Sequence, residues 1–354
     1  MRTRALTGAA AASALALVGT LATAPTAQAA TNDPLHGKLW GLQQVRAEQA
    51  WGSSTGTGTV VAVVDTGVDF SQPDLRGQLL QGATFTGCPA NQRPCGNGDF
   101  RGPDGQNDGD EHGTHVAGTV AAARNNGVGV VGVAPGAKIL PVKVLEAGSG
   151  SSEDIGDGIR WAADHGADVV NLSLGSVPGG QALSITGLDS AMKEAIDYAR
   201  SKGVLTVAAA GNSSTALCND PAFTTDGICV GATDRNGLHS WYSELPNKTD
   251  LKAVSAPGGA GLTGCDDDIW STVPRGTGTA GGCGQADYDA YAGTSMATPH
   301  VAGVAALLYA QGRTVDQVED AILSTAVTPG TGARGTYSPT YGFGVVDAEA
   351  AVAS

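Results

Sequence analysis

The sequence predicts one α/β domain in three layers, with a central, mainly parallel sheet flanked by helices on both faces. Short apolar runs recur along the chain at 60–64, 139–145, 169–172, 204–209 and 228–230. Such unbroken runs are typical of strands that are covered on both faces. Helical patterns alternate with them at 112–123, 152–165, 188–202, 294–311 and 315–325. This alternation favours right-handed crossovers between parallel strands.

Local signals place the ends of these elements. The first strand is Val-Val-Ala-Val-Val at 60–64. The helix predicted at 152–165 begins at Ser152, a capping residue. Two acids follow it, and they interact favourably with the helix dipole. The 188–202 helix ends at Lys202-Gly203, a common helix stop. The segment 257–284 is rich in glycine and proline, and we interpret it as a surface excursion within the domain rather than as a linker.

Residues 1–30 have the pattern of a signal peptide. Arg2 and Arg4 give a positive start, an apolar run follows, and Ala27-Gln28-Ala29 is a small-x-small cleavage site. The alternative, a membrane anchor, is disfavoured because the apolar run is shorter than the roughly 20 residues that span a bilayer. We therefore expect the domain at 31–354 to be secreted, extracellular and free of the membrane once the signal is removed.

The composition excludes some classes of partner. The chain of 354 residues carries a formal net charge of −14, which makes nucleic acid and anionic membranes poor partners. It has 53 glycines and only 5% aromatic residues, so we expect many tight turns rather than a core built on large rings.

The six cysteines fall into three couples that are close in sequence: Cys88 with Cys95, Cys218 with Cys229, and Cys265 with Cys283. Six cysteines allow 15 pairings, and the sequence cannot choose among them. We expect local pairing, because an exported chain favours disulfides. Buried free thiols are the alternative.

Three short motifs carry the chemistry. Asp65 lies in Val-Val-Asp-Thr-Gly, His112 opens His-Gly-Thr-His-Val-Ala-Gly, and Ser295 lies in Gly-Thr-Ser-Met-Ala-Thr-Pro. An acid, an imidazole and a hydroxyl are the parts of an activated serine nucleophile. Alone, each residue has an ordinary interpretation: a turn aspartate, a surface histidine or a helix N-cap. Together, and in this order, they predict nucleophilic catalysis.

The order acid, base, serine is that of the subtilisins. The chain resembles the subtilisin-like (S8 family) secreted serine proteases, with features of thermitase-like members. The resemblance runs from about Asn32 to the Gly-Phe-Gly-Val-Val-Asp-Ala stretch at 342–348. It implies a subtilisin-like fold and a serine endopeptidase that hydrolyses peptide bonds through an acyl-enzyme intermediate.

The resemblance also implies a role for each residue of the catalytic site. Ser295 is expected to attack, His112 to take its proton, and Asp65 to hold the imidazole ring and stabilise its charged form. Asn212, in Ala-Ala-Ala-Gly-Asn, matches the side-chain donor of the family's oxyanion hole. The second oxyanion donor is expected to be the backbone N–H of Ser295, at the start of a helix.

The expected substrate site has two segments, of which the second forms one wall of the S1 pocket; the opposite wall stays open. One is the edge segment Ser173, Leu174 and Gly175, which resembles the family segment that pairs with an extended peptide. The other is Ala209, Ala210 and Gly211, which are expected to line the S1 pocket for the substrate residue on the acyl side of the scissile bond (P1). Small residues there favour a large P1 side chain.

Two acids leave the specificity open. Asp220 either favours a basic P1 residue or faces solvent. Glu111, next to His112, either favours a basic residue in the neighbouring subsite or has no such role.

The resemblance implies a calcium site like that of thermitase-like members. Its expected ligands are three side chains and three backbone carbonyls: Asp33, Asp74 and Asn126, with the carbonyls of Arg124, Val128 and Val130. Hard oxygen ligands from scattered loops suit calcium. The alternative is that these residues only cap turns. No organic cofactor is expected.

Relatives of this family usually carry an inhibitory pro-segment after the signal, whereas here Asn32-Asp33-Pro34 follows it directly. We therefore expect the enzyme to fold unaided, helped by disulfides and calcium, or the short tail to be all that is removed. The expected partners are protein or peptide substrates, and the expected state is a monomer. The competing function is a catalytically silent peptide-binding protein on the same scaffold. A lipase or esterase is disfavoured because the Gly-x-Ser-x-Gly motif is missing.

Overall fold

The computed structural model describes Met1 and residues 31–354, except 90, 104, 106–110, 176–189, 224, 248–250, 263 and 279–281. The predicted signal peptide therefore lies outside the described residues apart from Met1. Within the described ranges, no helix combines the length and apolar character that crossing a membrane requires.

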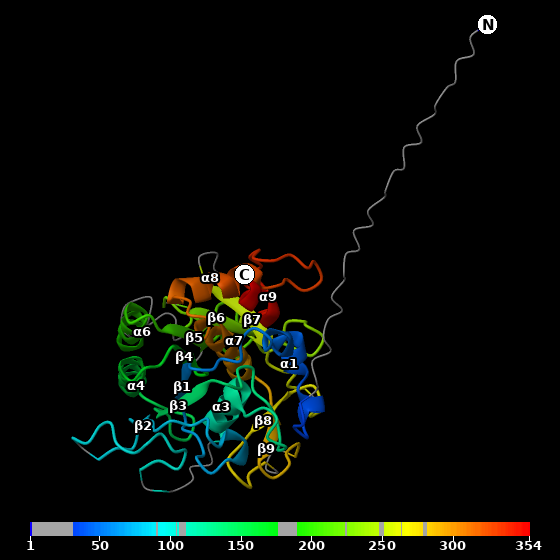
Figure 1. Cartoon of the computed structure of the whole chain (residues 1–354). Coiled ribbons are helices and arrows are strands. Elements are labelled where there is room, and N and C mark those ends of the chain that lie inside the picture. Colours follow the sequence, from blue (N-terminus) through cyan, green and yellow to red (C-terminus); the bar gives the residue numbers. More distant parts are fainter. Residues whose placement is uncertain are drawn as a thin grey trace.

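Seven strands of the described chain form one parallel sheet, in the order β2-β3-β1-β4-β5-β6-β7 (Figure 1). The strands are β1 (Val60–Asp65), β2 (Ala83–Thr84), β3 (Lys138–Lys143), β4 (Val169–Leu172), β5 (Leu205–Ala209), β6 (Ile228–Thr233) and β7 (Ala253–Pro257). The five predicted strands are present, with ends that differ by at most three residues from the prediction. Because all neighbours are parallel, their carboxyl ends share one edge of the sheet.

Helices cover both faces of this sheet. They are η1 (His36–Lys38), α1 (Trp40–Gln44), α2 (Ala47–Ala50), η2 (Pro73–Leu75), α3 (His112–Ala121), α4 (Ser152–Asp164), α6 (Ala191–Ser201), α7 (Thr294–Tyr309), α8 (Val315–Thr325) and α9 (Ala348–Ala353). Figure 1 shows α4 and α6 side by side at one flank of the sheet, while α3 and α7 lie together on the other face.

The strands divide their side chains between two cores, as the predicted three layers require. In β1, Val61 and Val63 pack into the core that contains α3 and α7, whereas Ala62 and Val64 pack into the core that contains α4 and α6. This alternation follows from the two-residue period of a strand. Burial on both faces explains why these strands read as unbroken apolar runs. The predicted fold class is confirmed.

The sequence patterns did not indicate several elements, among them strand β7 and a hairpin that follows it. Strand β7 pairs in parallel with β6, but its sequence Ala-Val-Ser-Ala-Pro has no unbroken run of large apolar residues. The predicted excursion at 257–284 also contains regular structure, because β8 (Ile269–Thr272) forms an antiparallel hairpin with β9 (Tyr288–Tyr291). The hairpin packs on α3, where the Ser271 hydroxyl donates to the His115 carbonyl at 2.7 Å.

All six cysteines are paired in the structure. The disulfides are Cys88–Cys95, Cys218–Cys229 and Cys265–Cys283, which are the three local couples expected from the sequence. The middle one joins the loop after β5 to strand β6, so it fixes the loop that follows Asn212.

Candidate active site

Asp65 and His112 meet at the carboxyl edge of the sheet. Asp65 is the last residue of β1 and is fully buried, and His112 is the first residue of α3. The His112 Nδ1 atom lies 2.8 Å from Asp65 Oδ1, which also accepts a hydrogen bond from the Thr66 backbone N–H at 2.8 Å. Because the carboxylate binds Nδ1, it leaves Nε2 as the nitrogen that faces away from the acid.

The turn after β1 holds α3 in place. The Gly113 N–H donates to the Thr66 hydroxyl at 2.9 Å, so the first turn of α3 rests on the residue next to Asp65. A Cβ on Gly113 would collide with the carbonyl oxygen of Gly67. Glycine at 113 therefore permits the close approach of helix and turn that brings the imidazole to the carboxylate.

Ser295 lies in the first turn of α7, and a proline further along this helix explains which donor its carbonyl binds. Pro299 has no N–H, so it cannot donate to the carbonyl four residues earlier, which is that of Ser295. The Ser173 hydroxyl donates to this carbonyl instead, at 2.8 Å. In return, the Ser295 hydroxyl donates to the Ser173 carbonyl at 3.1 Å. The start of α7 is thus fastened to the end of β4.

Asn212 presents its amide nitrogen beside Ser295. Its Oδ1 accepts from the N–H of Thr294 at 2.8 Å and from the Thr294 hydroxyl at 3.0 Å. A Cβ on Gly293 would lie 3.5 Å from Asn212 Nδ2 and 3.7 Å from the Ser295 backbone nitrogen. The absence of a side chain at 293 therefore leaves a space that both N–H donors border.

These groups share one end of the molecule. Strands β1 and β4 are neighbours in the sheet, and α3 packs against α7. Asp65, Ser173 and Asn212 stand at or just beyond the carboxyl ends of β1, β4 and β5, and the two helices start above them. Residues that are far apart in sequence therefore lie at one edge of the sheet, as predicted for Asp65, Ser173 and Asn212.

The two predicted substrate-binding segments both lie against one buried side chain, that of Asn219. A Cβ on Gly175 would lie 3.6 Å from Asn219 Cβ, and a Cβ on Gly211 would collide with Asn219 Nδ2. Leu174 and Gly175 are partly or fully exposed, whereas Ala209 and Ala210 are buried.

The structure corrects one alternative and locates another acid. Asp220 does not face solvent, because it is 1% exposed. Glu111 accepts a hydrogen bond from the Tyr291 hydroxyl at 2.6 Å, which holds the carboxylate beside the start of α3.

Lys143, a buried lysine beside the candidate site, was not predicted. It pairs in register with Asp65, is fully buried, and donates from Nζ to the Thr66 carbonyl at 2.9 Å and the Leu145 carbonyl at 3.1 Å. A lysine inside an apolar run was the available signal, because a lysine is rarely buried without partners. Its charge lies directly behind the turn that carries the carboxylate.

The three side chains predicted as metal ligands, those of Asp33, Asp74 and Asn126, lie together. Asp33 accepts from the backbone N–H groups of Asn125 and Asn126, and Asp74 accepts from Val130 N–H at 2.7 Å. Burial, with a smaller contribution from the Asp33 charge, raises the pKa of Asp74 to about 7. The Asn126 side-chain N–H donates to Asp74 Oδ1 at 2.6 Å, so the amide nitrogen, and not the oxygen expected of a ligand, faces this carboxylate.

Other features of this region limit the ligand set. The Arg124 guanidinium lies over the Trp51 ring, 4.4 Å from its centroid, so only the backbone of Arg124 is a candidate. In the described part of the chain, no three side chains of His, Cys, Asp or Glu gather as a metal site.

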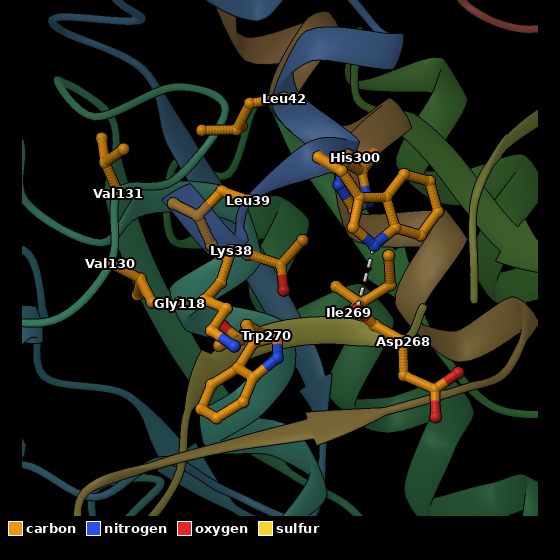
Figure 2. A pocket seen from close by; sticks show the side chains of 14 residues that line it. Lys38, Leu39, Leu42, Gly118, Val130, Val131, Asp268, Ile269, Trp270 and His300 are labelled. Carbon is orange, nitrogen blue, oxygen red and sulfur yellow. Dashed lines mark hydrogen bonds between the residues drawn. The ribbon is translucent and has the colours of Figure 1, made fainter. Parts of the chain in front are cut away.

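A separate small pocket lies between α1 and the β8–β9 hairpin (Figure 2). Trp40, Trp270 and His300 line it, and the Trp40 indole donates to the Asp268 carbonyl at 3.1 Å. Burial lowers the pKa of His300 to about 4, so its ring is neutral at physiological pH. The pocket contains none of the predicted catalytic or substrate-binding residues.

Comparison with known proteins decides the family. Residues 56–344 match the model of the subtilase family, Peptidase_S8. The chain belongs to the subtilase family. This subtilase is 39% identical over 297 residues to thermitase from Thermoactinomyces vulgaris. The aligned region covers 83% of the chain and 91% of thermitase. It is also 39% identical over 317 residues to subtilisin Savinase from Lederbergia lenta. That aligned region covers 88% of the chain and 97% of subtilisin Savinase.

Solved structures agree with the sequence relatives. The subtilase superposes on a protease from Pseudoalteromonas arctica with a TM-score of 0.73 at 33% identity, covering 92% of the chain and 99% of that structure. The predicted family is confirmed. This subtilase is accordingly a serine endopeptidase, and its substrates are proteins or peptides.

Proposed function

We propose that this subtilase hydrolyses peptide bonds through an Asp65–His112–Ser295 triad and an acyl-enzyme intermediate. The observation that carries this assignment is the hydrogen bond of 2.8 Å between Asp65 and His112, at the sheet edge where Ser295 starts α7. The simplest test is hydrolysis of casein by the purified protein, blocked by phenylmethanesulfonyl fluoride. A protein that binds casein but leaves it intact would support the catalytically silent alternative.

The proton moves as follows. The Ser295 hydroxyl turns from the Ser173 carbonyl, which it meets at 3.1 Å, towards Nε2 of His112. As Oγ forms a bond to the substrate carbonyl carbon, its proton passes to Nε2, and buried Asp65 stabilises the resulting imidazolium. The same proton goes to the amine leaving group as the peptide C–N bond breaks. Water then hydrolyses the acyl-enzyme through the same proton transfers.

The oxyanion hole consists of Asn212 Nδ2 and the Ser295 backbone N–H. Both border the space that Gly293 leaves open, so an oxygen placed there receives two hydrogen bonds. Donors fixed in advance are effective because they need no reorganisation as the charge develops.

Replacing Asn212 by alanine is expected to lower kcat by about 10²–10³-fold, a range measured in a subtilisin, with little change in KM. Because Oδ1 of Asn212 also accepts from Thr294 N–H, the matched variant is Asn212→Asp, which keeps this acceptor and removes the donor. The aspartate variant is expected to lose at least as much activity as the alanine variant. Wild-type kcat in either variant would contradict the role of Asn212.

The substrate backbone is proposed to pair with Ser173, Leu174 and Gly175, and its P1 side chain to enter between them and Ala209, Ala210 and Gly211. Leu174, which is partly exposed, and Gly175, which is exposed, follow β4 after Ser173, so this segment offers backbone groups for an added strand. Such pairing does not depend on substrate side chains. We further propose that the chain acts outside the cell as a monomer, after loss of residues 1–30.

Calcium is proposed to bind beside Asp33 and Asp74. Two buried carboxylates in one place repel each other, and the raised pKa of Asp74 reflects this burial and repulsion. Carboxylate, amide and carbonyl oxygens fit a hard cation. The ion would be held by Asp33 and Asp74, by the Asn126 oxygen once its amide group has rotated by half a turn, and by the carbonyls of Arg124, Val128 and Val130. The bound ion would supply positive charge that ties the N-terminal segment to this loop.

Calcium is expected to stabilise the fold, as measured by urea unfolding of the Ser295→Ala variant, which cannot digest itself. At about a thousandfold excess over the dissociation constant, the gain in unfolding free energy is about 4 kcal/mol. Asp74→Asn should lose most of this gain, whereas Asp320→Asn, at an exposed site, should keep it. If the Ser295→Ala variant with Asp74 intact has the same urea midpoint in calcium and in EDTA, the residues of this site only cap turns.

A further inference from the structure

One polar side chain interrupts the apolar strand β4 on the face that carries the site. Asn171 is fully buried and lies on the same face as Val169, which packs into the core that contains α3 and α7. Val170 and Leu172 point into the opposite core. Burying an amide costs free energy unless it is hydrogen-bonded, so Asn171 needs a partner on this face.

The partner is the hydroxyl of Ser173, two residues further along. Asn171 Nδ2 lies 2.9 Å from Ser173 Oγ, and Ser173 Oγ lies 2.8 Å from the carbonyl oxygen of Ser295. A carbonyl can only accept, so the single hydroxyl proton of Ser173 goes to Ser295. The Ser173 oxygen is then the acceptor for the NH₂ group of Asn171. The hydrogen-bond chain therefore runs in one direction, from Asn171 through Ser173 to Ser295.

This hydrogen-bond chain replaces a bond that α7 lacks. Pro299 has no N–H to offer to the Ser295 carbonyl, so the donor comes from outside the helix. Because Asn171 binds the Ser173 oxygen, it directs the hydroxyl proton towards Ser295. Successive hydrogen bonds in a buried setting also strengthen one another. The backbone of Ser295 is thus fixed by strand β4 where its own helix supplies no donor.

The link matters most while Ser295 attacks. At rest, a second hydrogen bond joins the same two residues, since the Ser295 hydroxyl donates to the Ser173 carbonyl at 3.1 Å. In the proposed mechanism Ser295 gives up this bond when its hydroxyl turns to His112. The Ser173 hydroxyl then still holds the Ser295 carbonyl. Loosening it at that moment disturbs the reacting geometry, where small displacements cost large factors in rate.

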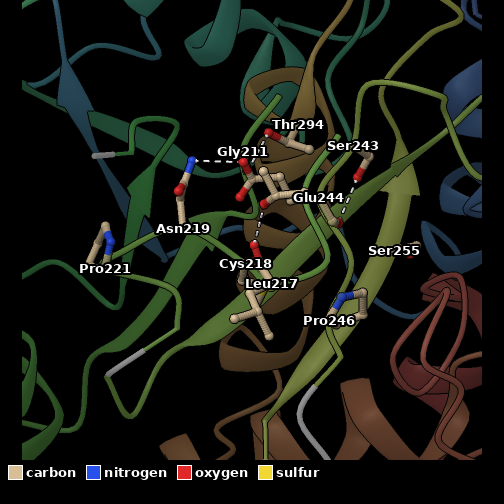
Figure 3. The surroundings of a disulfide bond; sticks show 12 residues. Gly211, Leu217, Cys218, Asn219, Pro221, Ser243, Glu244, Pro246, Ser255 and Thr294 are labelled. Atoms are coloured by element: carbon tan, nitrogen blue, oxygen red, sulfur yellow. Dashed lines mark hydrogen bonds between the residues drawn. A yellow bond between two sulfur atoms is a disulfide. The ribbon is translucent and has the colours of Figure 1, made fainter. Parts of the chain in front are cut away.

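The start of α7 is also fastened on a second side. The Thr294 hydroxyl accepts from the Gly211 N–H at 3.1 Å and donates to Asn212 Oδ1 at 3.0 Å, and Figure 3 shows Thr294 beside Gly211. These contacts tie α7 to the end of β5 and do not involve Asn171. Removing the Asn171 amide therefore leaves the helix attached and changes how Ser295 is oriented.

Asn171 is not placed for the stability of the fold. Its Oδ1 atom is buried and makes no hydrogen bond within the described part of the chain. A buried acceptor without a partner is destabilising. A leucine, which has a similar size and shape, would lack both this acceptor and the donor to Ser173. A local feature that costs stability is expected at functional sites.

We infer that Asn171 is a positioning residue for the nucleophile: acting through the Ser173 hydroxyl, it orients the backbone of Ser295 for attack. The inference rests on the proposed function, because it takes Ser295 as the nucleophile. It assigns this role to a side chain that reaches Ser295 through a second residue. It also gives Ser173 two roles, since its hydroxyl serves Ser295 while its backbone is proposed to pair with the substrate.

The test measures hydrolysis of succinyl-Ala-Ala-Pro-Phe p-nitroanilide and stability in the same variant, Asn171→Leu. We expect kcat to fall at least about tenfold while KM stays within about twofold of wild type, because substrate binding uses backbone groups. The urea midpoint, measured in the Ser295→Ala background to prevent self-digestion, is expected to stay equal or to rise, because the unpaired Oδ1 is gone. A purely structural role predicts the reverse, a lower midpoint with kcat retained.

A double-mutant cycle tests whether Asn171 acts through Ser173. Ser173→Ala is expected to lower kcat by more than Asn171→Leu does, because the Ser295 carbonyl then loses its donor. In the Ser173→Ala background, adding Asn171→Leu should change kcat by less than about twofold.

Thr206→Val is the matched control. Thr206 is buried in the neighbouring strand β5, and its Oγ1 atom has no hydrogen-bond partner within the described residues. It pairs with Val170, so it lies on the opposite face of the sheet from Asn171. This variant also replaces a buried polar side chain by an apolar one, and it should keep the wild-type kcat.

The inference is overturned if Asn171→Leu keeps kcat within about twofold of wild type, if its loss lies in KM, or if the losses of the two single variants multiply in the double variant. If Asn171→Leu does not fold, Asn171→Ala takes its place, and its kcat and its coupling to Ser173→Ala decide in the same way. Failure of the proposed function looks different, because then the wild type itself leaves both the peptide and casein intact.

Discussion

Replacing Ser295 by alanine is expected to lower kcat by roughly 10⁶-fold, the size of the loss when a subtilisin loses its serine. Without Oγ no acyl-enzyme can form, so only binding and the oxyanion donors remain. The substitution removes a single oxygen, whose hydrogen bond in the structure goes to the Ser173 carbonyl at 3.1 Å. The measurement is peptide hydrolysis in a long assay with enough enzyme to detect the residual rate.

Binding and stability serve as controls for this variant. The Ser295 carbonyl still accepts from the Ser173 hydroxyl, so the start of α7 is retained. Circular dichroism and the urea midpoint should match those of inhibitor-blocked wild type. Activity within tenfold of wild type in Ser295→Ala would show that another residue is the nucleophile.

Replacing Asp65 by alanine is expected to lower kcat by about 10⁴-fold, again the scale found in a subtilisin. The carboxylate both orients His112 and balances its charge in the transition state. Because it is fully buried, no water can readily replace either effect. The readout is kcat at saturating peptide, where losses in binding do not contribute.

Asp65→Asn separates the two effects. Asp65 Oδ1 accepts from both Thr66 N–H and His112 Nδ1, so the asparagine oxygen can keep both contacts. We expect this variant to lose nearly as much kcat as Asp65→Ala, because a neutral amide cannot balance the imidazolium. Near wild-type turnover in Asp65→Asn would show that orientation, not charge, is what Asp65 supplies.

Much of this site could be predicted from the sequence, because its parts lie at the ends of recognisable elements. The apolar run 60–64 predicts a strand that ends near Asp65, and parallel strands place their carboxyl ends on one edge. Motifs at such ends therefore converge even when they are far apart in sequence. The same reasoning placed Ser173 and Asn212 correctly at that edge.

The residues that were missed act through tertiary packing. Nothing local to Glu244 marks its contact with Asn219, because Glu244 reaches Asn219 from a different loop across 25 residues of sequence. Asp220 was considered because it stands close to the expected base of the S1 pocket, but the burial of its side chain depends on how the loop folds. Strand β7 was missed because neighbours cover it and its own residues are small.

The most direct test of the central claim is covalent labelling of the folded protein with a fluorophosphonate, followed by intact mass and peptide mapping. We expect one adduct, on the peptide that contains Ser295, and its loss in the His112→Ala variant although that variant remains folded. An unlabelled wild-type protein, or an adduct on any other residue, would contradict it.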